Sequence, residues 1–179
     1  MRKKKAVTIC IVCIILCMTA ICGCTQTNID PEKVQVPEDF LFSITWNVYG
    51  ISSYDSETGT LIKTTDATHP ENYITNLELS EETLKEIYIK LTKDIDLYSY
   101  KNEYNPFSFV SQPTQTIIIS LTADGASKTV TCEDIALGDA EEARTQKGRK
   151  FMKVRDEIVE IITNTEEWKS LPDYEFGYD

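Results

Sequence analysis

The fold is decided by residues 114–132, which read TQTIIISLTADGASKTVTC. The first nine residues are rich in threonine and isoleucine, whose β-branched side chains favour a strand. The pair Asp124-Gly125 follows, and Asp-Gly between two strand-forming runs is typical of a tight hairpin turn. The chain then returns from Lys128 to Cys132 as a second strand. Three consecutive isoleucines at 117–119 predict burial on both faces of the first strand, and hence a central place in a sheet.

Three upstream segments also have strand patterns. Residues 40–49 alternate large apolar and polar side chains, as half-buried strands do. Residues 55–59, DSETG, have the composition of a hairpin loop, after which residues 60–65 return as a strand. Residues 73–79 form another run of this kind. The sequence therefore predicts a sheet of about five antiparallel strands.

Two helices are predicted to cover this sheet. Ser80 precedes an apolar stripe at helical spacing over residues 81–94, and its hydroxyl can accept hydrogen bonds from the first-turn amides. A longer helix is expected from about residue 139 to 163, with a stripe that includes Phe151 and Ile158. The expected fold is an α+β domain in which an antiparallel sheet is packed by two amphipathic helices on one face. A barrel-like curl of the sheet is the alternative.

Arg155 interrupts the apolar stripe of the second predicted helix. On a helical projection it lies about 20° from Ile162 and about 40° from Val159, inside the apolar arc. A guanidinium keeps its charge, so its burial without a partner would be costly. We expect its charge to reach water at the edge of the stripe, to pair with an acid from the sheet, or to hold a ligand anion. Arg155 is therefore a candidate contact residue.

The first 24 residues have the pattern of an export signal. Four bases, Arg2 to Lys5, precede an uncharged apolar run that ends at Cys22. The last four residues, Ile21-Cys22-Gly23-Cys24, resemble the lipobox of bacterial lipoproteins. The resemblance implies that residues 1–23 are a signal peptide and that Cys24 carries a lipid with acyl chains such as palmitate. Residues 24–39, which are polar and contain two prolines, are then a linker.

This resemblance also implies a location. The protein is expected at the cell membrane, held by the lipid on Cys24, with residues 40–179 as a single extracytoplasmic domain. The alternative is an uncleaved membrane helix over residues 6–22, which would span roughly 25 Å, short of the ~30 Å hydrocarbon core. Both alternatives leave the basic residues 2–5 in the cytoplasm.

The composition excludes several classes of protein. The chain has 18 Lys plus Arg against 29 Asp plus Glu, and removing residues 1–23 leaves 14 bases against 29 acids, a net charge of −15. Such an acidic chain lacks the basic footprint of a nucleic-acid-binding protein. Beyond Cys24 the only cysteine is Cys132 and the only histidine is His69. We therefore expect no disulfide in the domain, no metal and no cofactor.

The segment 96–113 concentrates the aromatic residues of the chain. Tyr98, Tyr100 and Tyr104 are candidate contacts for a ligand or partner, because exposed aromatic rings can stack on sugars or cover a protein surface. The alternative is that alternate members, either Tyr98 with Tyr100 or Phe107 with Phe109, complete the core.

Three classes of function remain open. The first, which we favour, is a non-enzymatic module that binds an unknown envelope or extracellular protein. The second is a receptor for a small molecule or carbohydrate that uses the aromatic segment 98–109. The third is an envelope hydrolase, with Asp55–Glu57 or Asp94–Asp96 as candidate carboxylate pairs. A deep pocket with convergent polar groups would favour the last two classes, and a flat exposed patch would favour the first.

Overall fold

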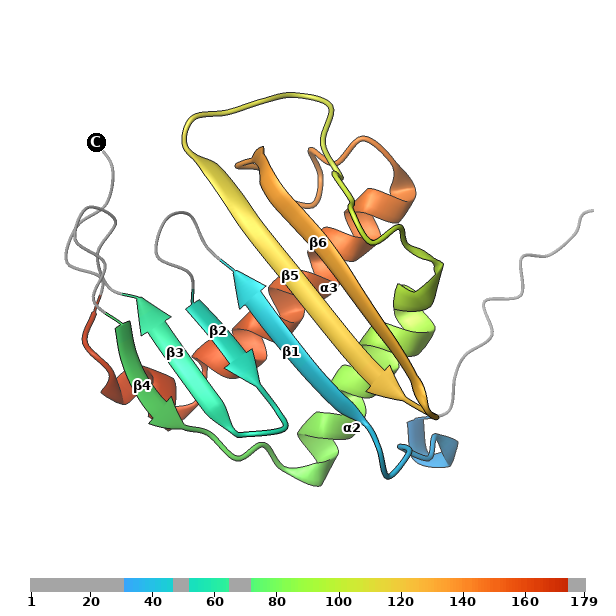
Figure 1. Cartoon of the computed structure of the whole chain (residues 1–179), viewed down its shortest axis with the longest axis vertical. Coiled ribbons are helices and arrows are strands. Elements are labelled where there is room, and N and C mark those ends of the chain that lie inside the picture. Colours follow the sequence, from blue (N-terminus) through green and yellow to red (C-terminus); the bar gives the residue numbers. More distant parts are fainter. Residues whose placement is uncertain (1–30, 47–51, 65–71, 174–179) are drawn as a thin grey trace, which may run out of the picture. The chain divides into compact units, whose positions relative to one another are not determined.

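The computed structural model of the chain describes residues 31–46, 52–64 and 72–173 (Figure 1). Residues Lys33–Asp179 form one compact unit, and of the other unit, Met1–Glu32, only the last two residues are described. The predictions for the signal peptide, Cys24, His69 and the end of the 40–49 strand lie outside the described residues. No described helix is both long and apolar enough to cross a membrane.

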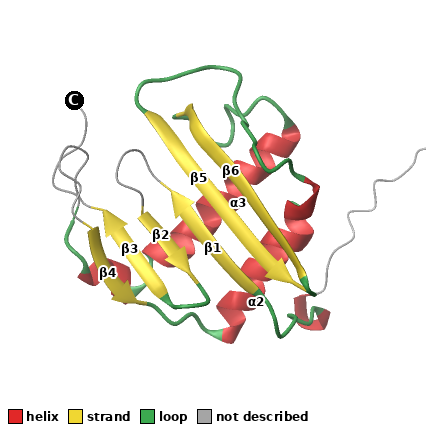
Figure 2. Ribbon diagram, viewed as in Figure 1, coloured by secondary structure: helices red, strands yellow, loops and turns green. Residues whose placement is uncertain are grey.

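One antiparallel sheet organises the domain, in the spatial order β4-β3-β2-β1-β5-β6. The strands are β1 (Leu41–Trp46), β2 (Ser52–Asp55), β3 (Thr60–Thr64), β4 (Asn72–Asn76), β5 (Thr114–Ala123) and β6 (Ala126–Ala136). Both long helices lie on the same face of this sheet (Figures 1 and 2). The α+β class is confirmed, but the sheet has six strands rather than about five.

The strand that the sequence did not predict is β2. Its four residues, SSYD, include two serines and an aspartate, so its composition resembles a loop. It nevertheless pairs with β1 on one side and β3 on the other. Tyr54 is buried, and its hydroxyl donates to the carbonyl of Leu77 at 3.2 Å. Pairing on both sides and one buried ring outweigh the weak strand propensity of this segment.

The β5–β6 hairpin is formed as predicted. Asp124 and Gly125 both have positive φ, 53° and 72°, as a two-residue hairpin turn requires. The carboxylate of Asp39 accepts from the backbone N–H of Asp124 at 2.9 Å and of Gly125 at 2.6 Å, so the segment leading into β1 is fixed to this turn. These hydrogen bonds lower the pKa of Asp39, that from Gly125 most.

The prediction that β5 is buried on both faces is wrong. β5 lies between β1 and β6, but its burial alternates strictly along the strand. Ile117 and Ile119 point into the core and are fully buried, whereas Ile118 points to the other face and is only half-buried. The reason is that both long helices cover one face of the sheet, and no other helix of the described residues covers the second face.

The first long helix begins where the sequence predicted. Ser80 caps α2 (Glu81–Ile89), and its hydroxyl accepts from the backbone N–H of Thr83 at 3.2 Å. A π-helical turn, η2 (Lys90–Asp94), continues α2, and a short 3₁₀ turn, η3 (Leu97–Ser99), follows. A further 3₁₀ turn, η1 (Pro31–Lys33), precedes β1.

The second long helix, α3 (Gln146–Thr163), starts seven residues later than predicted. The carboxylate of Asp139 accepts from the N–H groups of Glu141 and Glu142, which holds this segment in a turn. Thr145 is the cap instead, and its hydroxyl accepts from Gly148 at 3.0 Å. A short helix, α4 (Glu166–Ser170), closes the described part of the domain.

The core lies between the sheet and the helices. Its largest fully buried side chains come from both layers: Ile44, Leu61, Leu77, Ile87, Leu91, Leu97, Ile117, Ile119, Leu121, Ile135, Phe151 and Met152. Val34 and Val36, which fall within the predicted linker 24–39, pack against this core because their side chains are apolar. The folded domain therefore begins upstream of residue 40, within the segment that the sequence predicted to be linker.

Candidate interaction site

Tyr100, a predicted contact residue, is part of the core. It is only 4% exposed, and its ring lies 5.1 Å from that of Tyr104 and 5.3 Å from that of Phe151. Its hydroxyl donates to the backbone carbonyl of Lys147 at 3.0 Å, and the Lys147 ammonium lies 4.1 Å from the ring centroid. Burial raises the pKa of Tyr100. No face of this ring is free to stack on a sugar.

Tyr104 is half-buried and holds its segment against the edge of the sheet. Its ring contacts Phe151, and its backbone N–H donates to the carbonyl of Thr131 at 2.9 Å. The N–H of Thr131 donates in turn to Asn102, so residues 102–104 lie parallel to β6. Burial is the main cause that raises the pKa of Tyr104. This residue serves the fold by covering part of an edge strand.

The remaining aromatic residues of the segment divide between core and surface. Tyr98 is exposed, and its hydroxyl donates to the carbonyl of Ala126 at 3.1 Å, next to the β5–β6 turn. Phe107 is buried, whereas Phe109 is exposed and packs against Phe107 with 5.3 Å between ring centroids. One member of each predicted pair, Tyr100 and Phe107, therefore completes the core.

Arg155 pairs with its neighbour on α3, Asp156, rather than with an acid from the sheet. Its Nε lies 3.0 Å from Oδ1 of Asp156, but the N–H is not directed at that oxygen and makes no hydrogen bond. The Arg155 side chain is 15% exposed and that of Asp156 is 49% exposed. Burial lowers the pKa of Arg155 and raises that of Asp156, and the attraction between the two charges only opposes these shifts. Burial therefore outweighs their pairing.

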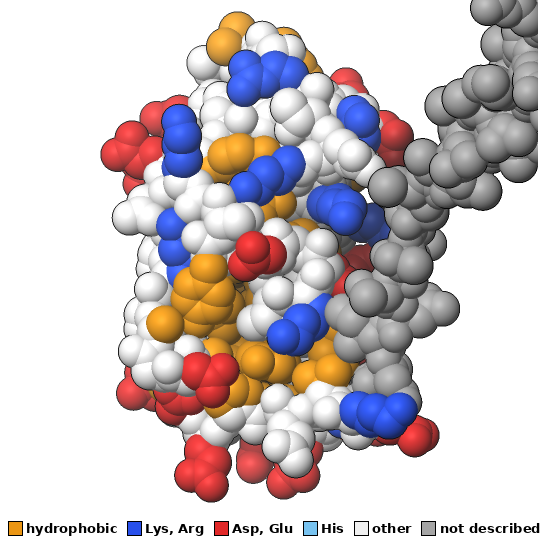
Figure 3. All heavy atoms as spheres, turned by 90° about the vertical axis from the view of Figure 1, so that its right-hand side faces the viewer, with side chains coloured by type: hydrophobic (Ala, Val, Ile, Leu, Met, Phe, Trp, Pro, Cys, Tyr) orange, Lys and Arg blue, Asp and Glu red, His pale blue; other side chains and the backbone are white. Residues whose placement is uncertain are grey.

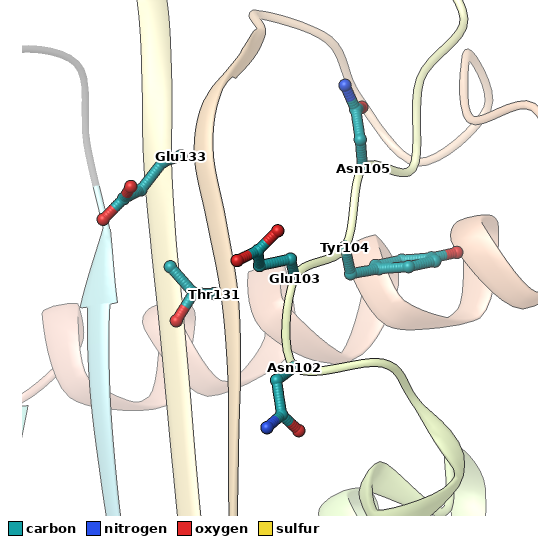
Figure 4. A pocket seen from close by; sticks show the side chains of 6 residues that line it. All are labelled: Asn102, Glu103, Tyr104, Asn105, Thr131 and Glu133. Atoms are coloured by element: carbon teal, nitrogen blue, oxygen red, sulfur yellow. The ribbon is translucent and has the colours of Figure 1, made fainter.

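A polar hollow of about 570 Å³ lies between residues 102–105 and β6 (Figure 4). Its lining residues are Asn102, Glu103, Tyr104, Asn105, Thr131 and Glu133. Tyr104 points away from the other five, toward α3. The hollow is open to solvent and lacks the apolar walls that most small-molecule sites have. Among the described residues, no group of three His, Cys, Asp or Glu side chains is placed to hold a metal ion.

The candidate carboxylate pairs have structural roles. Oδ1 of Asp55 accepts from the backbone N–H groups of Glu57 and Thr58, and so shapes the turn between β2 and β3. Asp96 has a positive φ of 48° and precedes η3, and its carbonyl accepts from Ser99. Both pairs also line open hollows on the surface, Asp55 with Glu57 and Asp94 with Asp96.

The side of the sheet opposite the two long helices is a surface feature that the sequence did not predict. We define the open face as ten residues of β1, β5 and β6 that share this side: Leu41, Ser43, Thr45, Thr116, Ile118, Ser120, Thr122, Ser127, Thr129 and Thr131. Eight hydroxyl groups on one surface would need many water contacts, but cross-strand pairs satisfy several of them. Ser120 and Thr129 lie 3.0 Å apart, and Thr122 and Ser127 2.9 Å apart. These ten side chains carry no charge, and two acids lie at their border, Asp55 of β2 and Glu133, which follows Thr131 on the same side of β6.

A second feature that sequence reasoning missed is an apolar tip on the loop before β5. We define the apolar tip as Phe109, Val110 and Leu137, all of which are exposed, Val110 to 93%. The loop before β5 and the segment after β6 are joined by a hydrogen bond of 2.7 Å, in which the backbone N–H of Leu137 donates to the hydroxyl of Ser111. The sequence carried one signal for this feature, because residues 104–123 contain no charged side chain.

Comparison of the sequence with known protein families and with curated proteins found no match.

Proposed function

We propose that this protein is a lipid-anchored, non-enzymatic module that binds a protein partner outside the cytoplasm, at the cell envelope. The observation that carries this proposal is the open face, whose ten side chains are uncharged on a strongly acidic protein. Charged residues make up 26% of the chain, yet none of the ten residues of the open face is charged.

The chemistry of the open face favours association with another protein. Charged residues are depleted in the centre of protein interfaces, because their desolvation is costly. The hydroxyl groups of Ser120 and Thr129 already form a hydrogen bond with each other. A partner that buries them therefore leaves fewer polar groups without a hydrogen bond. Ile118 and Leu41 add apolar area to the same surface.

The burial of Tyr100 supports this choice over a carbohydrate receptor. A sugar-binding platform needs exposed ring faces, and Tyr104 turns its ring toward Phe151. The roles of Asp55 and Asp96 in turns likewise support a binding module over a hydrolase.

Substitution of Cys24 and an intact-mass measurement test the proposed location. Cys24→Ala should release the mature domain from membranes or leave an uncleaved precursor, because the lipid is attached to that cysteine. Intact-mass measurement of membrane-extracted wild-type protein should show cleavage before Cys24 and the added mass of acyl chains. A mass that retains Met1 and lacks acyl chains would refute the anchored location.

Binding through the open face is tested by introducing one charge at its centre. Ser120 pairs with Ser43 on one side and Thr129 on the other, so Ser120→Lys places an ammonium in the middle of the surface. We expect this variant to fold, since a lysine stem can lie along the sheet with its charge in water. Chemical crosslinking of intact cells should give a partner adduct with wild-type protein and with Ser170→Lys, an exposed control on α4, but not with Ser120→Lys. An adduct that survives Ser120→Lys would contradict the proposal.

A further inference from the structure

We infer that the apolar tip is a second contact element, which enters an apolar pocket with a basic rim on a protein that faces away from the anchoring membrane. This inference concerns a surface separate from the open face. The claim that the partner lies on the side away from the membrane rests on the proposed lipid anchor.

The apolar tip is held in place by the core rather than being a loose loop. Phe109 packs on buried Phe107, and Ser111 accepts from the N–H of Leu137 while its hydroxyl donates to the carbonyl of Pro113 at 2.8 Å. Gly138 is needed at this junction, because a Cβ there would lie 2.8 Å from Cε1 of Phe107 and 3.1 Å from Cζ of Phe109. The fold therefore fixes an exposed valine and phenylalanine in one position, which lowers the entropy lost on binding.

The apolar tip and the start of the domain lie at opposite ends of the sheet. The segment before β1 is fixed to the β5–β6 turn by Asp39, at the end of β5. The loop that carries Val110 precedes Thr114, at the beginning of β5 (Figure 1). A strand of ten residues spans about 33 Å. A lipid upstream of Lys33 therefore tethers the end of the domain that is remote from the apolar tip.

The charge around the apolar tip defines the chemistry of its partner. Residues 133–144 contain five acids and one base, Arg144, a net charge of −4. The backbone N–H of Arg144 donates to the carbonyl of Pro106, so this base also lies beside the loop. Figure 3 shows hydrophobic side chains at the upper end of the molecule, where the loop before β5 lies, with Lys or Arg side chains directly below them. Arg149, which donates to the carbonyl of Ala143, is a second base in this region, so five acids stand against two bases. An apolar centre with this excess of acid fits a basic-rimmed apolar pocket and is repelled by anionic lipid.

The inference is tested with a photo-crosslinking amino acid at position 110 of the full-length protein in intact cells. We expect an adduct with one protein other than this chain, and none with the same group at exposed Glu166 on α4. Glu133→Lys and Glu141→Lys, in separate cells, should each lower the adduct yield roughly five-fold, as expected for loss of one exposed ion pair. The same charge change at Glu166 should leave the yield unchanged.

Other outcomes would overturn the inference. These are no adduct, an adduct with lipid, an adduct with a second copy of this chain, or a protein adduct that is insensitive to both charge reversals. Ser120→Lys separates this inference from the proposed function, since it should remove contacts of the open face and leave crosslinking at position 110 intact. The acyl mass on Cys24 reports independently on the anchor.

Discussion

Replacing Arg155 with methionine should stabilise the domain. The long apolar stem on α3 is retained, while a charge that is 15% exposed is removed together with its buried Nε–H, which makes no hydrogen bond. An unsatisfied buried donor costs about 1–3 kcal/mol. The contact with Asp156, which is 49% exposed, contributes at most ~1 kcal/mol after screening by solvent. The expected net gain in the free energy of unfolding is therefore about 1 kcal/mol.

Urea denaturation of residues 33–179, followed by circular dichroism, measures this change. A gain of 1 kcal/mol corresponds to a rise in melting temperature of about 2–4 °C for a domain of this size. Lys153→Met is the matched control, because it removes a charge from an exposed position of α3 and should change stability by less than ~0.5 kcal/mol.

Asp156→Asn provides the opposite test. It leaves the Arg155 guanidinium buried without a counter-charge, and we expect a loss of about 1–2 kcal/mol, below the 3–5 kcal/mol of a fully buried pair. The reasoning is refuted if Arg155→Met lowers stability by roughly 2 kcal/mol or more, since the guanidinium would then make net stabilising contacts.

Three other variants or probes test separate features of the fold. Cys132 in residues 33–179 should resist a thiol reagent at pH 8 until the domain is unfolded, because burial raises the pKa of its thiol to about 12; rapid labelling of the folded domain would contradict this. Asp39→Asn should destabilise the domain at pH 7 and have no effect at low pH. The folded pKa of Asp39 lies below its unfolded value, so its contribution is present above about pH 4 and is lost as the pH falls through the folded pKa; an effect that does not depend on pH would argue against the carboxylate cap. Gly148→Ala should lower the free energy of unfolding by about 1 kcal/mol, although alanine favours helices. The new Cβ would lie 3.2 Å from Cβ of Ala143 and 3.3 Å from the carbonyl oxygen of Pro106. A gain in melting temperature would show that these neighbours can move.

The parts of the fold that the sequence predicted are those with strong local signals. The Asp124-Gly125 turn and the Ser80 cap depend on a few adjacent residues, and both formed as expected. β2 was not predicted because its stability comes from pairing with strands on both sides, which local composition does not indicate. The start of α3 was misplaced because Asp139 binds neighbouring amides as a turn rather than continuing the helical pattern.

The candidate site was harder to predict, because exposure depends on how distant segments pack. Tyr100 and Tyr98 are two residues apart in similar sequence, yet α3 covers only Tyr100. The open face exists because both helices pack on one side of the sheet. The sequence predicted this packing, but we did not infer from it that Ile118 would lie on the other side, only half-buried. The loop that exposes Val110 is held through Ser111 and Leu137, a contact across 26 positions that no periodicity records.

The proposed attachment of the chain has a mechanical consequence. In that arrangement a tether pulls on the domain at the start of β1, while a partner held at the loop before Thr114 pulls on the start of β5. These two strands are antiparallel neighbours, paired from Leu41–Thr122 to Thr45–Ile118. The two forces act along the strands in opposite directions and load the hydrogen bonds between them in shear, all at once, since these bonds lie perpendicular to the strands. With the proposed anchor and partner, tension between them meets the combined resistance of these hydrogen bonds and does not break them one at a time.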